Sequence, residues 1–152
     1  MAALIASATA IVLRKDQQNA NGFKVLLLQR NTKLVTHGGS WVFPGGKVEV
    51  ADYDILNTRP FEQCDDALLS LSNDEQLSVT KTTAARETYE EAGLHLDEQS
   101  LKLVSTWLTP ESMDKRFHAW FFVTQTDRES VFVDGGEIKA YQWLSPHEAL
   151  KM

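Results

Sequence analysis

The chain has 152 residues, of which 43% are hydrophobic and 24% charged, as expected of one globular domain with a sizeable core. Its formal net charge is −6 and no basic block stands out, which argues against a nucleic-acid polymer as partner. Cys64 is the single cysteine, so a disulfide or a cysteine-based structural zinc site within one chain is excluded. A reducing compartment, the cytoplasm, is the expected location.

The N-terminal third predicts short β-strands. The apolar run at residues 2–13 has no basic residue before it and contains hydroxyl side chains, so we interpret it as a strand, Ser7–Leu13, and not as a signal peptide or membrane span. Asp16–Gly22 is polar and turn-like, and Phe23–Gln29 is a second strand, which together predict a hairpin. A short strand, Trp41–Phe43, follows and leads into a Pro-Gly-Gly turn at Pro44–Gly46.

The middle of the chain is acidic and then helical. Within residues 50–82, a short amphipathic helix is expected at Pro60–Leu71, broken by Ser72-Asn73-Asp74. The main helix is predicted from about Thr82 to Ala92, with Thr82 or Thr83 at its start and Gly93 as a left-handed C-terminal cap. Its buried stripe is predicted to comprise Ala85, Tyr89 and Ala92.

The C-terminal third predicts paired strands and a last helix. Leu101–Thr109 and Phe117–Thr126 form a pair around the loop Pro110–Arg116, and Ala140–Leu144 follows a turn. Ser145-Pro146 opens a helix that has hardly begun when the sequence stops, which suggests a truncated C-terminal helix. The fold class we infer is α/β in a single domain, residues 1–152, with a mixed sheet and helices packed on its faces.

Three carboxylates mark the main helix as the centre of the chemistry. Glu87, Glu90 and Glu91 have the spacing i, i+3, i+4 and so share one helix face. Like charges so placed repel, and a divalent cation such as Mg²⁺, which takes carboxylate oxygens, would compensate. A solvated helix face is the alternative when these residues are considered alone.

The surrounding residues resemble a known family. Arg86-Glu87-Thr88-Tyr89-Glu90-Glu91-Ala92-Gly93-Leu94 matches the second half of the Nudix box, and Gly46 with Asp52, where the family has Glu, matches the first half. An insertion at about residues 53–78 separates the halves. Glu137, six residues before Trp143, resembles the family's late acidic ligand. The chain is therefore similar to the Nudix hydrolases, which cleave nucleoside diphosphates linked to another moiety.

A further set of residues resembles one branch of that family. The entry Trp41–Val48, the pair Thr109-Pro110 and the run Arg116–Phe122, together with the interrupted box, are similar to the branch that contains the peroxisomal coenzyme A diphosphatase. The fold that this resemblance implies is the Nudix α/β/α sandwich. The implied substrate is a nucleoside diphosphate derivative, with coenzyme A-like compounds as one candidate.

The resemblance also implies roles for individual residues. It implies hydrolysis of a pyrophosphate bond, an acid anhydride of phosphorus, with Mg²⁺ or Mn²⁺ as cofactor. The expected metal ligands are Glu87, Glu90, Glu91, Glu137 and the Gly45 carbonyl. The expected catalytic residues are Glu87, Glu90 and Arg86, with Glu137 and Glu111 as rival general bases. The expected substrate contacts are Arg30, Gly46, Lys47 and Phe117.

Two other classes of function stay open from the sequence. One is a Nudix module that binds a nucleotide without hydrolysing it, as a sensor. The other is an interaction domain in which the inserted segment docks a partner. The expected partner is a small nucleotide, with no membrane, and a homodimer is left open.

Overall fold

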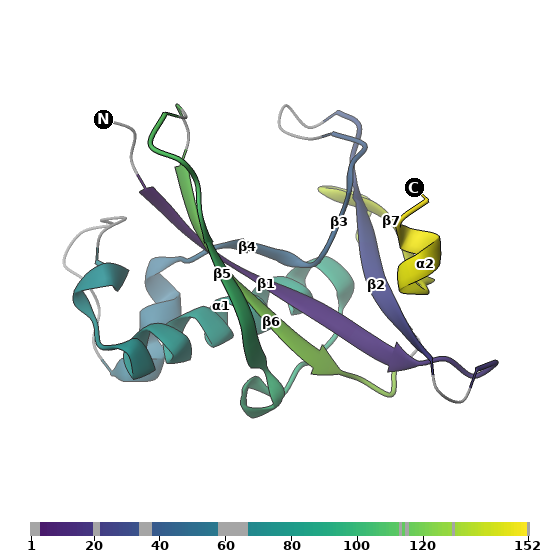
Figure 1. The fold of residues 1–152 in the computed structure, drawn as a ribbon, viewed down its shortest axis with the longest axis horizontal. Coiled ribbons are helices and arrows are strands. Elements are labelled where there is room, and N and C mark those ends of the chain that lie inside the picture. Colours follow the sequence, from purple (N-terminus) through teal and green to yellow (C-terminus); the bar gives the residue numbers. More distant parts are fainter. Residues whose placement is uncertain are drawn as a thin grey trace.

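The structure is a computed structural model, which describes residues 4–19, 22–33, 38–57, 67–112, 114, 116–128 and 130–151. Its centre is a seven-stranded sheet with β1 (Leu4–Lys15) in the middle, in the order β3-β2-β1-β6-β5, with β4 paired to β1 and β7 paired to β2 (Figure 1). The other strands are β2 (Phe23–Arg30), β3 (Trp41–Val42), β4 (Gly45–Lys47), β5 (Lys102–Leu108), β6 (Arg116–Gln125) and β7 (Ile138–Leu144). The sheet is mixed because β1 and β6 are parallel whereas the other pairs are antiparallel. The predicted α/β class is confirmed.

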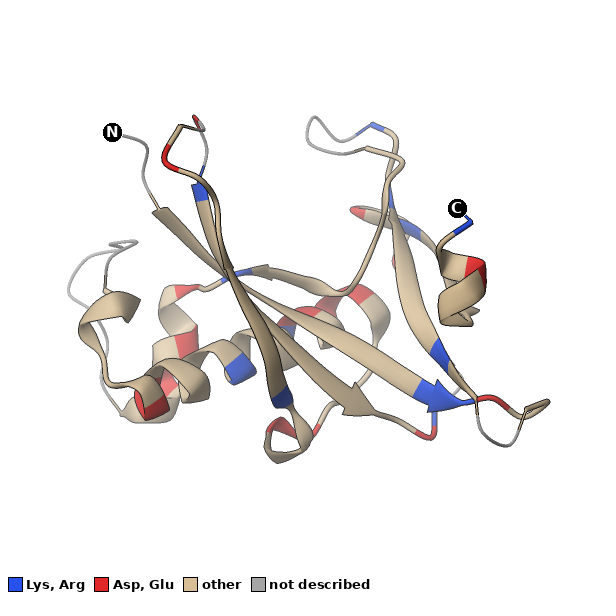
Figure 2. Ribbon diagram, viewed as in Figure 1, with Lys and Arg blue, Asp and Glu red and all other residues tan. Residues whose placement is uncertain are grey.

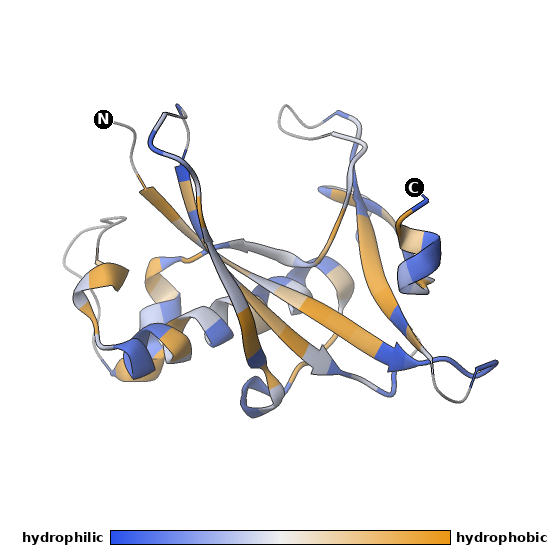
Figure 3. Cartoon of the chain, viewed as in Figure 1, coloured by the Kyte–Doolittle hydropathy of each residue, from blue (hydrophilic) through white to orange (hydrophobic). Residues whose placement is uncertain are grey.

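Along β1, side chains that are buried in the core alternate with side chains on the opposite face of the sheet. Ala6, Ala8, Ala10 and Val12 are buried, and they belong to the core cluster with side chains of helix α1 (Asn73–Ala92). Successive side chains of a strand point to opposite faces, so Ser7 and Thr9 face away from this core. Figure 3 shows apolar residues along the strands and a more polar α1. The sheet therefore presents one face to α1 and leaves the other available to line a site.

The predicted hairpins are confirmed. β1 and β2 pair antiparallel around Leu13 and Val25, and β5 and β6 pair antiparallel as expected. The last strand, β7, begins at Ile138, two residues before the predicted start. Helix α2 (Pro146–Ala149) begins as predicted, because Ser145 accepts a hydrogen bond from the Glu148 amide.

The prediction of a Pro-Gly-Gly turn is wrong. Gly45 and Gly46 lie in strand β4, which pairs antiparallel with β1 at Thr9 and Ala8. The Ala10 amide also donates to the Pro44 carbonyl over 2.9 Å. Because glycine lacks a side chain, this segment can pack closely between β1 and α1. Strand pairing thus holds the two glycines in an extended conformation that local turn preferences do not predict.

Helix α1 begins nine residues earlier than predicted. Ser72 is its N-cap, and Ser72 and Glu75 exchange hydrogen bonds of 3.1 and 3.2 Å in a capping box. The segment that was interpreted as a helix break is therefore the helix start. At the other end Gly93 adopts φ 68° and caps the helix, as predicted. The buried-stripe prediction is wrong for Tyr89, which is 51% exposed.

Short 3₁₀ helices complete the described structure: η1 (Val50–Leu56), η2 (Leu68–Ser70) and η3 (Glu98–Ser100). Most of the helix predicted at Pro60–Leu71, with Cys64, lies outside the described residues. Figure 2 shows acidic residues on both η1 and α1, which are packed together. No helix in the described part of the chain is long and apolar enough to cross a membrane.

Candidate active site

A buried ion pair joins the two halves of the predicted box. Asp52, on η1, is 1% exposed. Its carboxylate accepts from Arg86 Nε over 2.8 Å, from Arg86 Nη2 over 3.1 Å and from Thr83 Oγ1 over 2.8 Å. The Glu49 amide donates to the same carboxylate over 2.9 Å. The fold thus brings Arg86 to Asp52, 34 residues away in the chain, and both oxygens of the buried carboxylate are satisfied.

Arg86 also holds two of the three helix carboxylates. Its Nη1 donates to Glu87 over 3.0 Å and to Glu90 over 3.1 Å, and Nη2 donates to the Lys47 carbonyl over 3.0 Å. Burial alone would lower the pKa of Arg86, but the hydrogen bond and charge of Asp52, with Glu87 and Glu49, raise it above its usual range. The guanidinium therefore stays charged and orients this face of α1.

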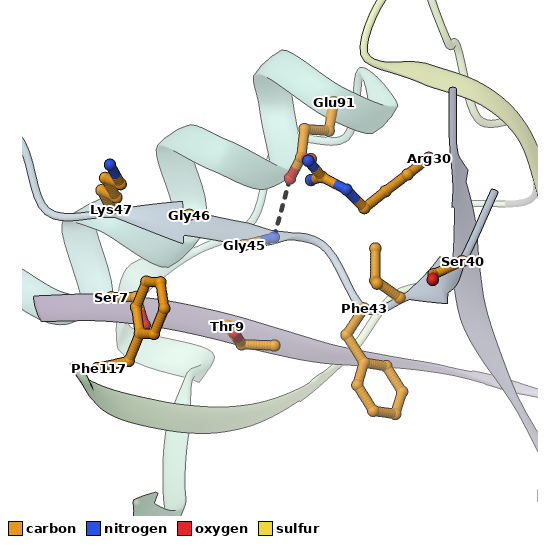
Figure 4. A pocket seen from close by; sticks show the side chains of 11 residues that line it. Ser7, Thr9, Arg30, Ser40, Phe43, Gly45, Gly46, Lys47, Glu91 and Phe117 are labelled. Carbon is orange, nitrogen blue, oxygen red and sulfur yellow. Dashed lines mark hydrogen bonds between the residues drawn. The ribbon is translucent and has the colours of Figure 1, made fainter. Parts of the chain in front are cut away.

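Glu91 is the buried member of the acidic triplet. Its side chain accepts from the Gly45 amide over 2.9 Å, and the residue is 8% exposed (Figure 4). Burial is the main reason why the pKa of Glu91 rises to about 8; Glu87 and Glu137 raise it further, while the Gly45 amide and Arg30 oppose the rise. Burial likewise raises the pKa of Glu87, and the charge of Arg86 partly offsets it. Strand β4 thus anchors one helix carboxylate directly.

Gly46 passes so close to α1 that a side chain at this position would meet the Glu87 carboxylate. A Cβ at this position would lie 2.5 Å from the carboxyl carbon of Glu87. Gly46 was predicted to contact substrate. In the structure its lack of a side chain also leaves the space that the Glu87 carboxylate occupies. Any larger residue would displace that carboxylate.

The carboxylates meet around one small cavity. The acidic cavity, of about 240 Å³, is lined by Glu87, Glu90, Glu91, Asp134, Glu137 and Ile138. Glu137 joins from the segment before β7, as the sequence led us to expect. Among the described residues, no three acidic, histidine or cysteine side chains are already placed to hold one metal ion. Arg86 donates to both Glu87 and Glu90, so these two carboxylates are directed toward the guanidinium.

Asp134 is a member of this cavity that the sequence analysis missed. It was expected only as part of a turn, and its Oδ1 does accept from the Gly136 amide over 2.8 Å. An aspartate before two glycines is typical of a turn, so no local signal distinguished it. Only the fold brings that turn to the end of α1.

A larger cavity adjoins the acidic one. The large cavity, of about 630 Å³, is lined by the expected substrate contacts Arg30, Gly46, Lys47 and Phe117 and by Gly45 and Glu91 (Figure 4). Sequence reasoning missed five of its residues: Ser7, Thr9, Ser40, Val42 and Phe43. Glu91 lines both cavities, and the Arg30 side chain extends toward it. Glu91 is therefore the residue that the two cavities share.

Glu111, the rival base, is placed differently from Glu137. It lies in an exposed turn after β5 and is not among the described residues that line either cavity. Its catalytic role stays a prediction from the sequence.

Comparison with known proteins agrees with this geometry. Residues 75–152 match the family model for the NUDIX domain, which covers half of the chain and includes α1 with its carboxylates. The chain therefore belongs to the Nudix family. A comparison with curated protein sequences finds no match.

Solved structures show the same fold at low sequence identity. A NUDIX hydrolase from Alicyclobacillus acidocaldarius has a TM-score of 0.74 at 20% identity, over 99% of this chain and 83% of that one. The NUDIX domain of Shewanella oneidensis NrtR, crystallised with ADP ribose, has a TM-score of 0.66 at 16% identity, over 100% and 79%. A C. elegans Ap4A hydrolase in a binary complex has a TM-score of 0.60 at 20% identity, over 97% and 84%.

Proposed function

We propose that this chain is a pyrophosphohydrolase that cleaves a P–O–P bond in a nucleoside diphosphate derivative. The observation that carries the proposal is that Glu91 lies in the wall of two cavities, one lined by carboxylates and one large enough for a nucleoside, so that Glu91 marks the junction between them. A diphosphate that spans the junction would have its phosphates beside the carboxylates and its organic part in the large cavity. Family membership supports this assignment.

The chemistry of the donor set fits Mg²⁺ or Mn²⁺. Glu87, Glu90, Glu91, Glu137 and the Gly45 carbonyl offer oxygen ligands, which hard divalent cations prefer. Glu91 is buried among negative charges that raise its pKa, so a cation beside it would stabilise its ionised form. Divalent ions bound here would neutralise phosphate oxygens and acidify a water molecule. Glu87 and Glu90 would turn away from Arg86 to reach them, while Asp52 keeps the guanidinium in place.

Glu137 is the general base that the geometry favours over Glu111, because it lines the acidic cavity. In the proposed hydrolysis a water oxygen bonds to one phosphorus, the bridging P–O bond breaks, and two monophosphates leave. The water's proton passes to the carboxylate and then to solvent. A base must lie within hydrogen-bond reach of the attacking water, a condition that a residue of the cavity wall can meet.

The substrate class we propose is a nucleotide with an aromatic base. Arg30 reaches toward Glu91 and would neutralise a phosphate at the junction, while Phe43 and Phe117 offer aromatic surface deeper in the large cavity. Lys47, also on the wall, could pair with an additional phosphate, as a coenzyme A-like substrate carries on its ribose. The crystal of a NUDIX domain with ADP ribose supports nucleotide derivatives as the class.

The test is a substrate screen with the purified protein. Coenzyme A, ADP-ribose, NADH, dinucleoside polyphosphates and deoxynucleoside triphosphates are incubated with Mg²⁺ and with Mn²⁺, and monophosphate release is measured. Release that requires the metal and is lost in Glu90→Gln supports the proposal. Wild-type rates in the metal-saturated Glu90→Gln protein would end it.

A nucleotide-binding module without turnover is the second candidate. The observation on its side is that the Arg86 guanidinium engages both Glu87 and Glu90. Tight binding of ADP-ribose by calorimetry, with no product under any metal condition, would favour the sensor. The homodimer, the cytoplasmic location and the docking role of the insertion stay predictions, which sedimentation, imaging and deletion of the insertion would test.

A further inference from the structure

Thr109 and Phe117 are joined at the end of the β5–β6 hairpin where the chain passes from β5 to β6. The Phe117 amide donates to Thr109 Oγ1 over 2.9 Å, and the Thr109 amide donates to the Phe117 carbonyl over 2.9 Å. Thr109 Oγ1 also donates to that carbonyl over 3.2 Å, and Arg116 Nε donates to the Thr109 carbonyl over 3.2 Å. Both polar groups of the Phe117 backbone therefore engage one threonine.

These contacts account for a sequence motif of which the proposed function uses only the Phe117 ring. Thr109-Pro110 and Arg116-Phe117 were singled out in the sequence, yet none of them lines the acidic cavity. Backbone pairing normally weakens at the end of a hairpin, because fewer neighbours hold it. Here the hydroxyl of Thr109 adds a donor and an acceptor at the last pair, and the guanidinium of Arg116 adds a third contact. The group is a clamp, comprising Thr109, Pro110, Arg116 and Phe117.

The clamp fixes a side chain that forms the wall of the large cavity. Phe117 pairs with Ile5 in the parallel β1–β6 register, so its side chain lies on the face of the sheet that carries Ser7 and Thr9. Figure 4 shows the Phe117 ring beside Ser7, on the side of the cavity away from Glu91. The direction of a side chain follows from its backbone, and the clamp defines that backbone.

We infer that this clamp is a specificity element, in which Phe117 stacks on the base of the bound nucleotide and Thr109 is the positioning residue. The inference rests on the proposed function, because it assumes that the large cavity receives the nucleoside. A planar base binds well to an aromatic ring, and the neighbouring hydroxyls of Ser7 and Thr9 can exchange hydrogen bonds with its edge. A flexible aliphatic group would gain less from a fixed ring than a base does.

The experiment measures binding of adenosine 5′-monophosphate by calorimetry, with ribose 5-phosphate as a ligand that lacks the base. We expect Phe117→Leu to weaken binding of the nucleotide about tenfold, in line with the usual contribution of base–aromatic stacking. Thr109→Val keeps the shape of the side chain but removes the hydroxyl, and it is expected to weaken binding about threefold to fivefold through the loosened ring. Ribose 5-phosphate should bind equally to all variants.

Three matched variants distinguish loss of the Phe117 ring position from a general loss of structure. Thr109→Ser restores the hydroxyl and should restore affinity, and Phe117→Tyr keeps the ring and should bind as the wild type does. Thr106→Val makes the same change on an exposed position of β5 and should have no effect. Thermal melts identify any variant that fails to fold. If a Thr109 variant fails, the difference in nucleotide affinity between Phe117→Leu and Phe117→Tyr tests the inference.

The results distinguish this inference from the proposed function. Wild-type affinity in Phe117→Leu, or no nucleotide binding by the wild type at millimolar concentration, overturns the clamp even if a diphosphate is hydrolysed. A base-dependent loss in Phe117→Leu and Thr109→Val, rescued in Thr109→Ser, supports the clamp even if no substrate is turned over. For any substrate found in the screen, the clamp variants should raise KM and leave kcat nearly unchanged.

Discussion

The acidic cavity and the large cavity share Glu91 but are built by different interactions. In the acidic cavity, charged groups position one another: Asp52 holds Arg86, and Arg86 holds Glu87 and Glu90. In the large cavity, hydrogen bonds to the main chain position the wall, as between Thr109 and Phe117. A change to one member of a charge network disturbs its partners. Hydrogen bonds to the main chain instead hold the backbone in place when a neighbouring side chain is changed. We therefore expect changes in the acidic network to affect turnover, and also stability where the changed group is buried, and changes in the large cavity to affect affinity alone.

The largest expected effect comes from removing one charge of the acidic cavity. Glu90→Gln should reduce turnover of the substrate found in the screen by about a thousandfold, within the usual range for loss of an acidic catalytic group. The side chain of Glu90 is 55% exposed, so the free energy of unfolding should change little. Steady-state kinetics and urea denaturation measure the two quantities. Glu98→Gln, the same change outside the cavity, is the control, and equal losses in both variants would contradict the comparison.

The second prediction tests whether the Asp52–Arg86 ion pair also stabilises the fold. Asp52→Asn leaves the Arg86 charge without its buried counterion, so it should lower the free energy of unfolding by about 3 kcal/mol. The same change should reduce turnover, because Arg86 would no longer be held in place. Urea denaturation of the metal-free protein measures the loss, with Asp127→Asn on the exposed surface as the control. A change below about 0.5 kcal/mol would show that the ion pair is not structurally important.

Gly46 lines the large cavity and lies against Glu87 of the acidic cavity, so a change there tests whether the two cavities act independently. Gly46→Ala places a methyl group against the Glu87 carboxyl, and a displacement of that size should lower kcat/KM by about 10- to 100-fold. Affinity for adenosine 5′-monophosphate should be nearly unchanged, since the base lies farther along the cavity. Gly22→Ala in the β1–β2 turn is the control. A parallel loss of nucleotide affinity would mean that the cavities are not independent.

The last prediction concerns protonation of Glu91, the residue that the cavities share. Its pKa of about 8 in the folded protein exceeds the ordinary value of 4.5, so the folded state retains a proton that the unfolded state loses between those values. This contribution to stability is present at low pH and is lost as the pH rises, with a slope of about 1.4 kcal/mol per pH unit.

Glu91→Gln removes that slope and should make the metal-free protein more stable than the wild type at pH 8. Urea denaturation at several pH values between 5 and 9 measures the difference. Curves that stay parallel for the two proteins would show that Glu91 is already ionised in the metal-free fold.

Much of the site was predictable because its signals are local. The helical period alone places Glu87, Glu90 and Glu91 on one face, and Gly93 ends the helix where its left-handed backbone requires glycine. The start of α1 was missed although Ser72 and Glu75 form a capping box, since Ser72-Asn73-Asp74 was interpreted as a helix break. That error was one of interpretation, because the signal was present in the sequence.

Other features depend on contacts between segments far apart in the chain. The sequence by itself determined the acidic helix face, the hairpins and the caps, since these follow from periodicity and from residues close in sequence. Only the tertiary structure decided that Gly45 and Gly46 pair with β1, that Asp52 meets Arg86 across the insertion, and that Asp134 joins the carboxylates. The physical reason is that a contact between distant segments depends on strand register and packing, which the local pattern around either partner does not specify.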